Sequence, residues 1–445
     1  MKIIKQLINN KAIKNAGWLI FGRILQMIIN FFVGIILARF LGPSNFGLIN
    51  YASAYTGFFA SFCNLGINSI LVRELINNQE KEGMVLGTSL LLKAVSSFLS
   101  AVSIVCIVMA VDKSETTTIL VVALCTLGMI FNVCDTFNYW FQSKLQSKVT
   151  AIATFAGYLI AALYKVFLIV TGKGVVFFAL STSLDYICVG IVLIFSYKKA
   201  GGQKLNFSKS YGRSLLKSSW HFILPALMVS IYAQTDKFML KQMINEAELG
   251  FYSTASTICT SWCFVLQAII DSFYPIIMES YKKKDIASYE RKNKLLYAFV
   301  FYISVAVSVI FCLFSGIIIK ILYGEEYLPS IVPLRIITWY TAFSYLGVAR
   351  NAWIVCEEKQ KYLKWVYGAA ALSNLLLNLI LIPCFGASGA AAASLAAQII
   401  TTMVAPAFIK DLRPNTIMIA EAIILKGIVP KNFFQKLKNN IVLRG

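Results

Sequence analysis

The chain has 445 residues, of which 58% are hydrophobic and only 14% are charged. Soluble globular proteins carry roughly a quarter charged residues, so this composition excludes an ordinary soluble protein and predicts that lipid covers the excess apolar surface. The formal net charge of +21 is high enough for a nucleic-acid-binding protein, but the placement of the charges, given below, argues against that partner.

Apolar runs long enough to cross a bilayer as a helix, about 20 residues each, follow one another from residue 16 onward. The final uncharged stretch is too long for one helix, and Pro383 and Gly386 mark the predicted break within it. The fold class predicted is therefore all-α, a polytopic membrane protein with about twelve transmembrane helices. The predicted spans are 16–40, 46–71, 84–110, 117–141, 151–171, 175–196, 219–243, 250–278, 296–319, 331–355, 365–384 and 388–409.

Most of the 41 lysines and arginines fall on one alternate set of loops. Cytoplasmic loops are enriched in these residues, so the asymmetry places both termini in the cytoplasm and turns the basic charge toward anionic lipid rather than nucleic acid. The opposite loops are short and offer no domain that could carry out catalysis. They hold only Arg39, Lys113, Lys173, Lys241 and Lys320.

The domain organisation follows from these spans. Residues 1–15 place apolar side chains on one helical face and lysines on the other, so they are predicted to form a cytoplasmic interfacial helix. The remaining segments are an N-lobe of six spans (16–196), a cytoplasmic linker (197–218), a C-lobe of six spans (219–409) and a basic cytoplasmic tail (410–445). The two halves resemble one another, because SNFGLINYAS (44–53) aligns with AELGFYSTAS (247–256) and matches Gly47 with Gly250. An even number of spans per half makes these parallel repeats, an arrangement common in transporters.

The sequence resembles the polysaccharide repeat-unit flippases of bacteria (the Wzx or O-antigen type) within the multidrug/oligosaccharidyl-lipid/polysaccharide exporter superfamily. The residues that carry the resemblance are ARFLGPSNFGLINYA after the first span, SWHFILPALMVSIYAQTDKFML (219–240) and LIPCFGASGAAAAS (381–394). The resemblance implies two six-helix lobes that form a V around a central cavity. It also implies alternating access that carries an undecaprenyl-diphosphate-linked oligosaccharide to the outer leaflet of the bacterial inner membrane, in the synthesis of O-antigen lipopolysaccharide or capsule.

Ionisable groups inside spans are costly and mark candidate functional sites. A diphosphate headgroup favours cations, arginine above all because its fork matches two phosphate oxygens, so the predicted headgroup ligands are Arg23, Arg350 and Lys93. For both arginines, a structural ion pair with Asp135 or Asp271 is the alternative. The residues predicted to serve ion coupling or gating are Asp236, Lys237, Asp185 and Asp271, with a self-contained Asp236–Lys237 pair as the alternative for the first two.

The function predicted is a lipid-linked oligosaccharide flippase, with H⁺ or Na⁺ as a coupling ion or the membrane potential as the driving force. No G-x-x-x-x-G-K-[ST] motif for ATP occurs, no metal site or other cofactor is expected, and the chain is not expected to be an enzyme. Polysaccharide polymerase and chain-length proteins are the expected protein partners. The alternatives are a cation-coupled multidrug exporter, a flippase for another lipid-linked precursor, a membrane glycosyltransferase and a scaffold protein.

Overall fold

The computed structural model describes residues 11–427, without the side chains of residues 11–16, 19–21, 23, 225 and 232. The first ten residues of the predicted interfacial helix and the tail beyond residue 427 lie outside this range. The described chain forms two compact units. The first contains the described residues up to Ser253 together with Leu322–Tyr327, and the second contains the rest.

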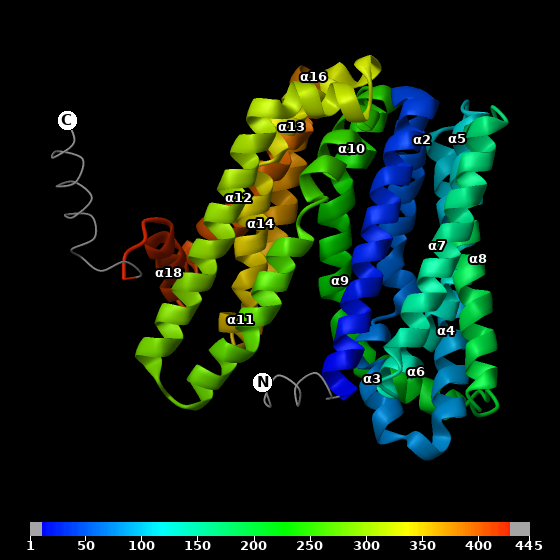
Figure 1. The fold of residues 1–445 in the computed structure, drawn as a ribbon, viewed down its shortest axis with the longest axis horizontal. Helices are drawn as coiled ribbons and strands as arrows, with labels where there is room; N and C mark the ends of the chain where they lie inside the picture. Colours follow the sequence, from blue (N-terminus) through cyan, green and yellow to red (C-terminus); the bar gives the residue numbers. More distant parts are fainter. Residues whose placement is uncertain (1–10, 428–445) are drawn as a thin grey trace. The chain divides into compact units, whose positions relative to one another are not determined.

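The first unit is built from helices, with a short 3₁₀ turn before α4 and another between α5 and α6. Figure 1 shows α4, α5, α7 and α8 running side by side with α2, and α9 also packs against α2. The predicted C-lobe begins at residue 219 and therefore includes most of α9, whereas the first compact unit contains this helix. Compact units are not the same as membrane lobes, so the lobe boundaries remain a prediction. The helices are α2 (Lys11–Asn64), α3 (Asn68–Asn77), α4 (Glu82–Val111), α5 (Thr116–Phe131), α6 (Thr136–Ser143), α7 (Ser147–Val170), α8 (Val175–Lys199), α9 (Lys209–Met243) and the first half of α10 (Glu246–Thr260).

The second unit is helical as well, and no β-strand occurs anywhere in residues 11–427. A π-helix, Ile400–Val404, follows α16, and its backbone hydrogen bonds span five residues instead of the four of an α-helix. The helices are α11 (Phe264–Lys282), α12 (Ile286–Leu322), α13 (Ile331–Ile337), α14 (Tyr340–Ala349), α15 (Asn351–Cys356), α16 (Leu363–Ile399), α17 (Ala405–Phe408) and α18 (Arg413–Ile423).

Seven helical segments are long and apolar enough to cross a membrane, and three pairs of bent helices raise the number to ten if each pair is one span. Two of the seven, Ile24–Asn77 and Gln360–Phe408, have 54 and 49 residues. At 1.5 Å per residue each is over about 70 Å long, more than twice the ~30 Å hydrocarbon core. The prediction of twelve spans requires that each of these two makes two crossings and that each bent pair makes one.

A glycine breaks each of these two long segments. Gly42 has φ 72° and ψ 171°, and Gly386 has φ 54° and ψ −131°. Side chains disfavour both conformations, so glycine allows the chain to turn there between two helices. The predicted break near Pro383 and Gly386 is therefore confirmed.

The matched glycines of the repeat lie where two helices cross in the first unit. A methyl group added to Gly47 would collide with the backbone carbonyl of Glu246, and one added to Gly250 would collide with that of Pro43. Each glycine thus lets its helix approach the start of the other. Reciprocal contacts of this kind are expected where two related segments meet about a local twofold axis.

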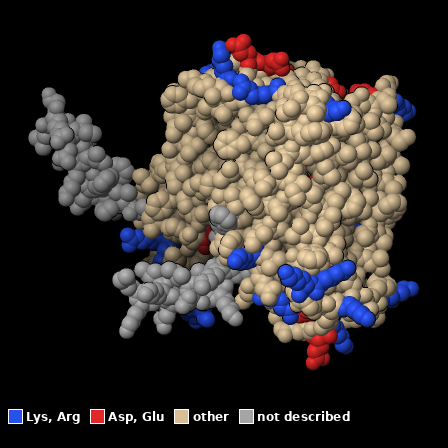
Figure 2. Space-filling model, turned by 45° about the vertical axis from the view of Figure 1, so that its right-hand side comes forward, with Lys and Arg blue, Asp and Glu red and all other residues tan. Residues whose placement is uncertain are grey.

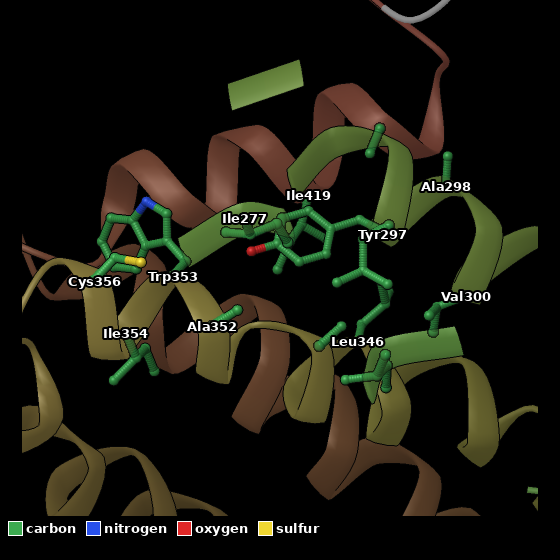
Figure 3. Packing of buried hydrophobic residues seen from close by; sticks show 14 of the residues in the cluster. Ile277, Tyr297, Ala298, Val300, Leu346, Ala352, Trp353, Ile354, Cys356 and Ile419 are labelled. Carbon is green, nitrogen blue, oxygen red and sulfur yellow. The ribbon is translucent and has the colours of Figure 1, made fainter. Parts of the chain in front are cut away.

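Each unit has its own apolar core. In the first unit, Trp140, Phe141 and Tyr197 pack with residues of α3 and α4. In the second unit, Tyr297 of α12 packs among Leu346, Trp353 and Ile419, so that α18 covers this core from outside the predicted spans (Figure 3). In the face drawn in Figure 2, charged side chains gather near the ends of the helices, and the wide band between them carries almost none. The band matches the surface that lipid covers.

Candidate functional site

Three polar cavities adjoin one another inside the first unit. One, of about 220 Å³, lies between α2, α4, α5 and α8 and is lined by Lys93 and Ser53 among others. A second, of about 310 Å³, shares Asn132 and Tyr186 with it. A third, of about 230 Å³, shares Asp135 with the second and extends to residues beside the predicted cytoplasmic loop 142–150. The three cavities therefore follow one another from the end of the unit that holds loop 142–150 into its middle.

Lys93 is the predicted headgroup ligand that faces the first of these cavities. Its residue is 2% exposed, and its ammonium donates to Asn68 Oδ1 at 3.0 Å and to Thr136 Oγ1 at 3.1 Å. Both partners are neutral, and no ion pair of Lys93 occurs among the described residues. A buried charge is usually paired with an opposite charge. Because Lys93 has no such ion pair, its ammonium group is open to interaction with a negatively charged group in the cavity.

Two carboxylates line the cavities next to Lys93. Asp185 on α8 pairs with Lys165 on α7 at 3.5 Å, and its Oδ1 accepts no hydrogen bond within the described structure. Asp135, at the end of the 3₁₀ turn Asn132–Asp135, accepts a hydrogen bond from the side chain of Asn138 and lines two of the cavities. The interior thus holds charges of both signs along one polar space.

Arg350 and Asp271 belong to the second unit and do not bond to one another. Arg350 is 2% exposed, and its two terminal nitrogens donate to the backbone carbonyls of Thr401 and Thr402, each at 3.3 Å. Those carbonyls belong to the π-helix, so the guanidinium supports an irregular part of the last span. Asp271 is exposed on α11 and accepts from the amide of Gln267 at 2.8 Å.

The remaining predicted residues lie on α2 and α9. The side chain of Arg23 falls outside the described residues, although its backbone belongs to α2. Asp236 is 4% exposed and accepts from the hydroxyl of Tyr252 at 2.6 Å. Lys237 follows it on α9 and is partly buried. Neither Asp236 nor Lys237 lines any of the three cavities described above.

A buried polar network at the end of α9 was not predicted from the sequence. Lys241 Nζ lies 2.6 Å from Asp112 Oδ1 and 2.7 Å from Glu115 Oε2, and Asp112 also accepts from Tyr51 and Gln242, at 3.0 Å and 2.9 Å. Both charged side chains of the central pair are nearly inaccessible, with 4% and 2% exposure. Lys241 and Asp112 lie at the ends of predicted spans, where a charged side chain normally reaches water. The sequence therefore does not indicate that these two side chains are buried.

The chain is similar to proteins named for polysaccharide biosynthesis and for O-antigen transport. Residues 12–281 match the family described as "Polysaccharide biosynthesis protein". The capsular polysaccharide biosynthesis protein CapF of Staphylococcus aureus is 22% identical over 390 residues, which cover 85% of this chain and 94% of that protein. A putative O-antigen transporter of Shigella flexneri is 22% identical over 398 residues, covering 85% and 93%.

Solved structures with the same fold are transporters. A multidrug resistance MATE family transporter of the MOP superfamily, in an inward-facing conformation, matches with a TM-score of 0.70 at 14% identity, over 89% of this chain and 95% of that one. The outward-facing conformation of such a transporter gives a TM-score of 0.63 at 15% identity, over 93% and 96%. At these identities the likeness concerns the fold. The chain is therefore a multi-pass membrane protein that belongs to the polysaccharide biosynthesis protein family and has the fold of MOP superfamily transporters.

Proposed function

We propose that this protein is a flippase, which moves undecaprenyl-diphosphate-linked oligosaccharide repeat units from the cytoplasmic to the outer leaflet by alternating access. The observation that carries the proposal is Lys93, a buried cation that faces a cavity and has only neutral hydrogen-bond partners. The names of the relatives, a capsular polysaccharide biosynthesis protein and a putative O-antigen transporter, support polysaccharide as the cargo.

The diphosphate of such a substrate brings about two negative charges into a low-dielectric interior, and a fixed cation offsets part of its desolvation. Among the proposed headgroup ligands, Lys93 lines one of the three cavities described above. Arg350 has its two terminal nitrogens engaged by carbonyls, so its contribution would require those bonds to open. The side chain of Arg23 lies outside the described residues and remains a proposed ligand.

Coupling to H⁺, Na⁺ or the membrane potential is proposed as the energy source. Asp185 suits this role, because one of its oxygens is unbonded and faces polar space beside Lys165. Asp236, Lys237 and Asp271 remain further candidates on α9 and α11. We propose that the protein acts as a transporter without catalysis, in the bacterial inner membrane with both termini cytoplasmic, beside polysaccharide polymerase and chain-length proteins.

A cation-coupled multidrug exporter is the second candidate. Asp135 favours it, because a carboxylate that lines two cavities and has no ion pair among the described residues can attract a cationic drug. The Lys93 cavity favours the anionic cargo.

A deletion strain distinguishes the two. Under the flippase proposal, loss of the protein leaves lipid-linked repeat units on the cytoplasmic leaflet and halts polysaccharide export, whereas sensitivity to cationic drugs does not change. Normal export in a strain with no second flippase would contradict the proposal, and a drug-sensitive strain with normal export would support the exporter.

A further inference from the structure

The buried network at the end of α9 joins residues of both predicted lobes. Asp112 belongs to the turn between α4 and α5, whereas Lys241 and Gln242 belong to the last turn of α9. Lys241 Nζ lies 2.6 Å from Asp112 Oδ1, and Gln242 donates to the same oxygen at 2.9 Å. Tyr51 of α2 donates to the other oxygen, Oδ2, at 3.0 Å. One carboxylate therefore holds α9 against α2, although the predicted linker separates these two helices in the sequence.

The network carries more negative than positive charge. Besides Asp112, Lys241 has Glu115 at 2.7 Å and Glu246 at 3.7 Å, so one cation faces three carboxylates. The two outer carboxylates, of Glu115 and Glu246, reach water, because their side chains are 43% and 27% exposed. If the network separates, water hydrates each charge and the repulsion between the carboxylates falls, whereas an apolar contact of the same size has no such compensation. The contact is therefore suited to repeated opening.

A second contact closes the same end of the unit, on loops that are predicted to face outward. Tyr327, in the segment Leu322–Tyr327 after α12, is fully buried and donates to the backbone carbonyl of Ala38 on α2 at 2.8 Å. Its ring centroid lies 6.4 Å from that of Phe46 on α2 and 6.3 Å from that of Phe251 on α10. Like the network, this contact joins a segment of the predicted C-lobe to α2.

Toward the cytoplasm, α2 and α9 make a neutral contact. The hydroxyls of Ser61 and Ser230 share a hydrogen bond at 2.7 Å. Nearer the middle, the side chain of Gln234 lies against Gly57, and its Oε1 accepts no hydrogen bond within the described structure. The charged contact is thus placed at the outer end of this helix pair.

We infer that this Lys241 network is a latch that keeps the outer end of the transport path closed and separates each time that end opens. Alternating access requires the lobes to part at one end while they meet at the other. Ser53, two residues after Tyr51 on α2, lines the cavity beside Lys93, so the network lies between that cavity and the outer loops. The inference rests on alternating access in the proposed function and does not depend on the cargo. The members of the network are Tyr51, Asp112, Glu115, Lys241, Gln242 and Glu246.

The test is thiol labelling of Ser53→Cys in intact cells, with an impermeant reagent outside and a chain that lacks the native cysteines. The closed latch should keep this labelling slow. Lys241→Met together with Asp112→Asn removes the ion pair without leaving Asp112 as a buried unpaired charge, and labelling should then become at least about tenfold faster. Equal rates in the two chains, or fast labelling while the latch is intact, would overturn the inference.

A buried ion pair at the opposite end supplies the matched control. Glu82, buried on α4, pairs with Lys144, so Lys144→Met together with Glu82→Gln removes a comparable pair beside loop 142–150. This variant should leave the labelling of Ser53→Cys unchanged, and an equal acceleration would show a general loosening of the fold instead of a latch. Ser114→Cys, exposed next to the network, should label quickly in every variant. Labelling of Ser114→Cys only after permeabilisation would overturn the assignment to the outer end.

A milder variant covers the case in which the double variant fails to fold. Tyr51→Phe keeps the ring and removes one hydrogen bond to Asp112, so it should speed labelling about threefold, and an unchanged rate would equally overturn the latch.

Export provides an independent arm. Lys241→Cys and Asp112→Cys, joined by a reversible bifunctional thiol reagent, should stop export, and a reductant should restore it. Normal export by the joined chain would contradict the latch. If the cysteine-free parent chain exports nothing while the labelling results hold, the flippase proposal fails and the latch does not.

Discussion

Buried charged residues in this protein have different partners, and their partners decide their roles. Lys241 lies among carboxylates, Arg350 bonds to backbone carbonyls, and Lys93 faces polar space. The sequence predicted Arg350 and Lys93 as equivalent ligands because both are cations within spans. Hydrogen-bond partners from distant helices, such as Thr402 for Arg350, distinguish them, and no spacing rule in a single sequence reveals such partners.

Lys241→Met should destabilise the protein by about 3 kcal/mol, because Asp112 would remain buried without its cation. Asp112→Asn in the same chain should restore most of the loss. Unfolding of purified protein measures both, with Lys199→Met as an exposed control. Equal stability of Lys241→Met and the wild type would show that the buried pair contributes nothing.

Arg350→Met should also act on stability, since it leaves the carbonyls of Thr401 and Thr402 without their donor, at a cost of about 2 kcal/mol. If Arg350 is chiefly structural, the protein that does fold should export polysaccharide at the normal rate per molecule. Full stability with lost export would instead support the headgroup role. Protein abundance and export, measured in the same cells, decide between them.

At the scale of helices, glycine positions decide where long apolar stretches turn and cross. The break at Gly386 was predictable, because Pro383 stands beside it in an uncharged stretch too long for one span. The break at Gly42 was predicted only as a boundary between runs. The bends inside single spans, between α10 and α11 and between α13 and α14, carry no such signal, because apolar composition does not specify the angle of a helix.

Gly250→Ala tests the crossing of α2 and α10. A methyl group there would meet the backbone of Pro43, which has no flexible side chain that could move aside, so we expect a loss of about 1–3 kcal/mol. Gly34→Ala is the matched control, because no atom lies within 4 Å of the added methyl group and alanine favours a helix by up to about 1 kcal/mol. Similar effects of the two substitutions would refute the close crossing.

For the whole molecule, charge asymmetry between loops predicts which side of the membrane each loop faces. In a background without the native cysteines, Leu205→Cys should react with an impermeant thiol reagent only after the cells are permeabilised, and Ser114→Cys should react in intact cells. Both positions are exposed. Labelling of residue 205 in intact cells would show that the predicted topology is inverted, and the direction of transport inferred from it would then be wrong.

All-helical architecture with many apolar spans was predictable from the sequence, because lipid requires long apolar helices whose backbone groups bond internally. The cavity beside Lys93 was not, since it arises where polar side chains from α2, α4, α8 and the 3₁₀ turn after α5 meet. Each of those side chains, such as Asn132 or Ser97, is unremarkable within its own span.

The proposed movement of a diphosphate-linked oligosaccharide across a bilayer is tested most directly with purified protein in liposomes. The liposomes carry an undecaprenyl-diphosphate-linked oligosaccharide, and a membrane-impermeant glycosidase is present outside. Flipping should expose the inner-leaflet half of the lipid, so the cleaved fraction should rise from about half toward completion, and Lys93→Met should slow this rise about tenfold or more. Cleavage that stays at half with well-inserted wild-type protein, under an imposed ion gradient and membrane potential, would contradict the account.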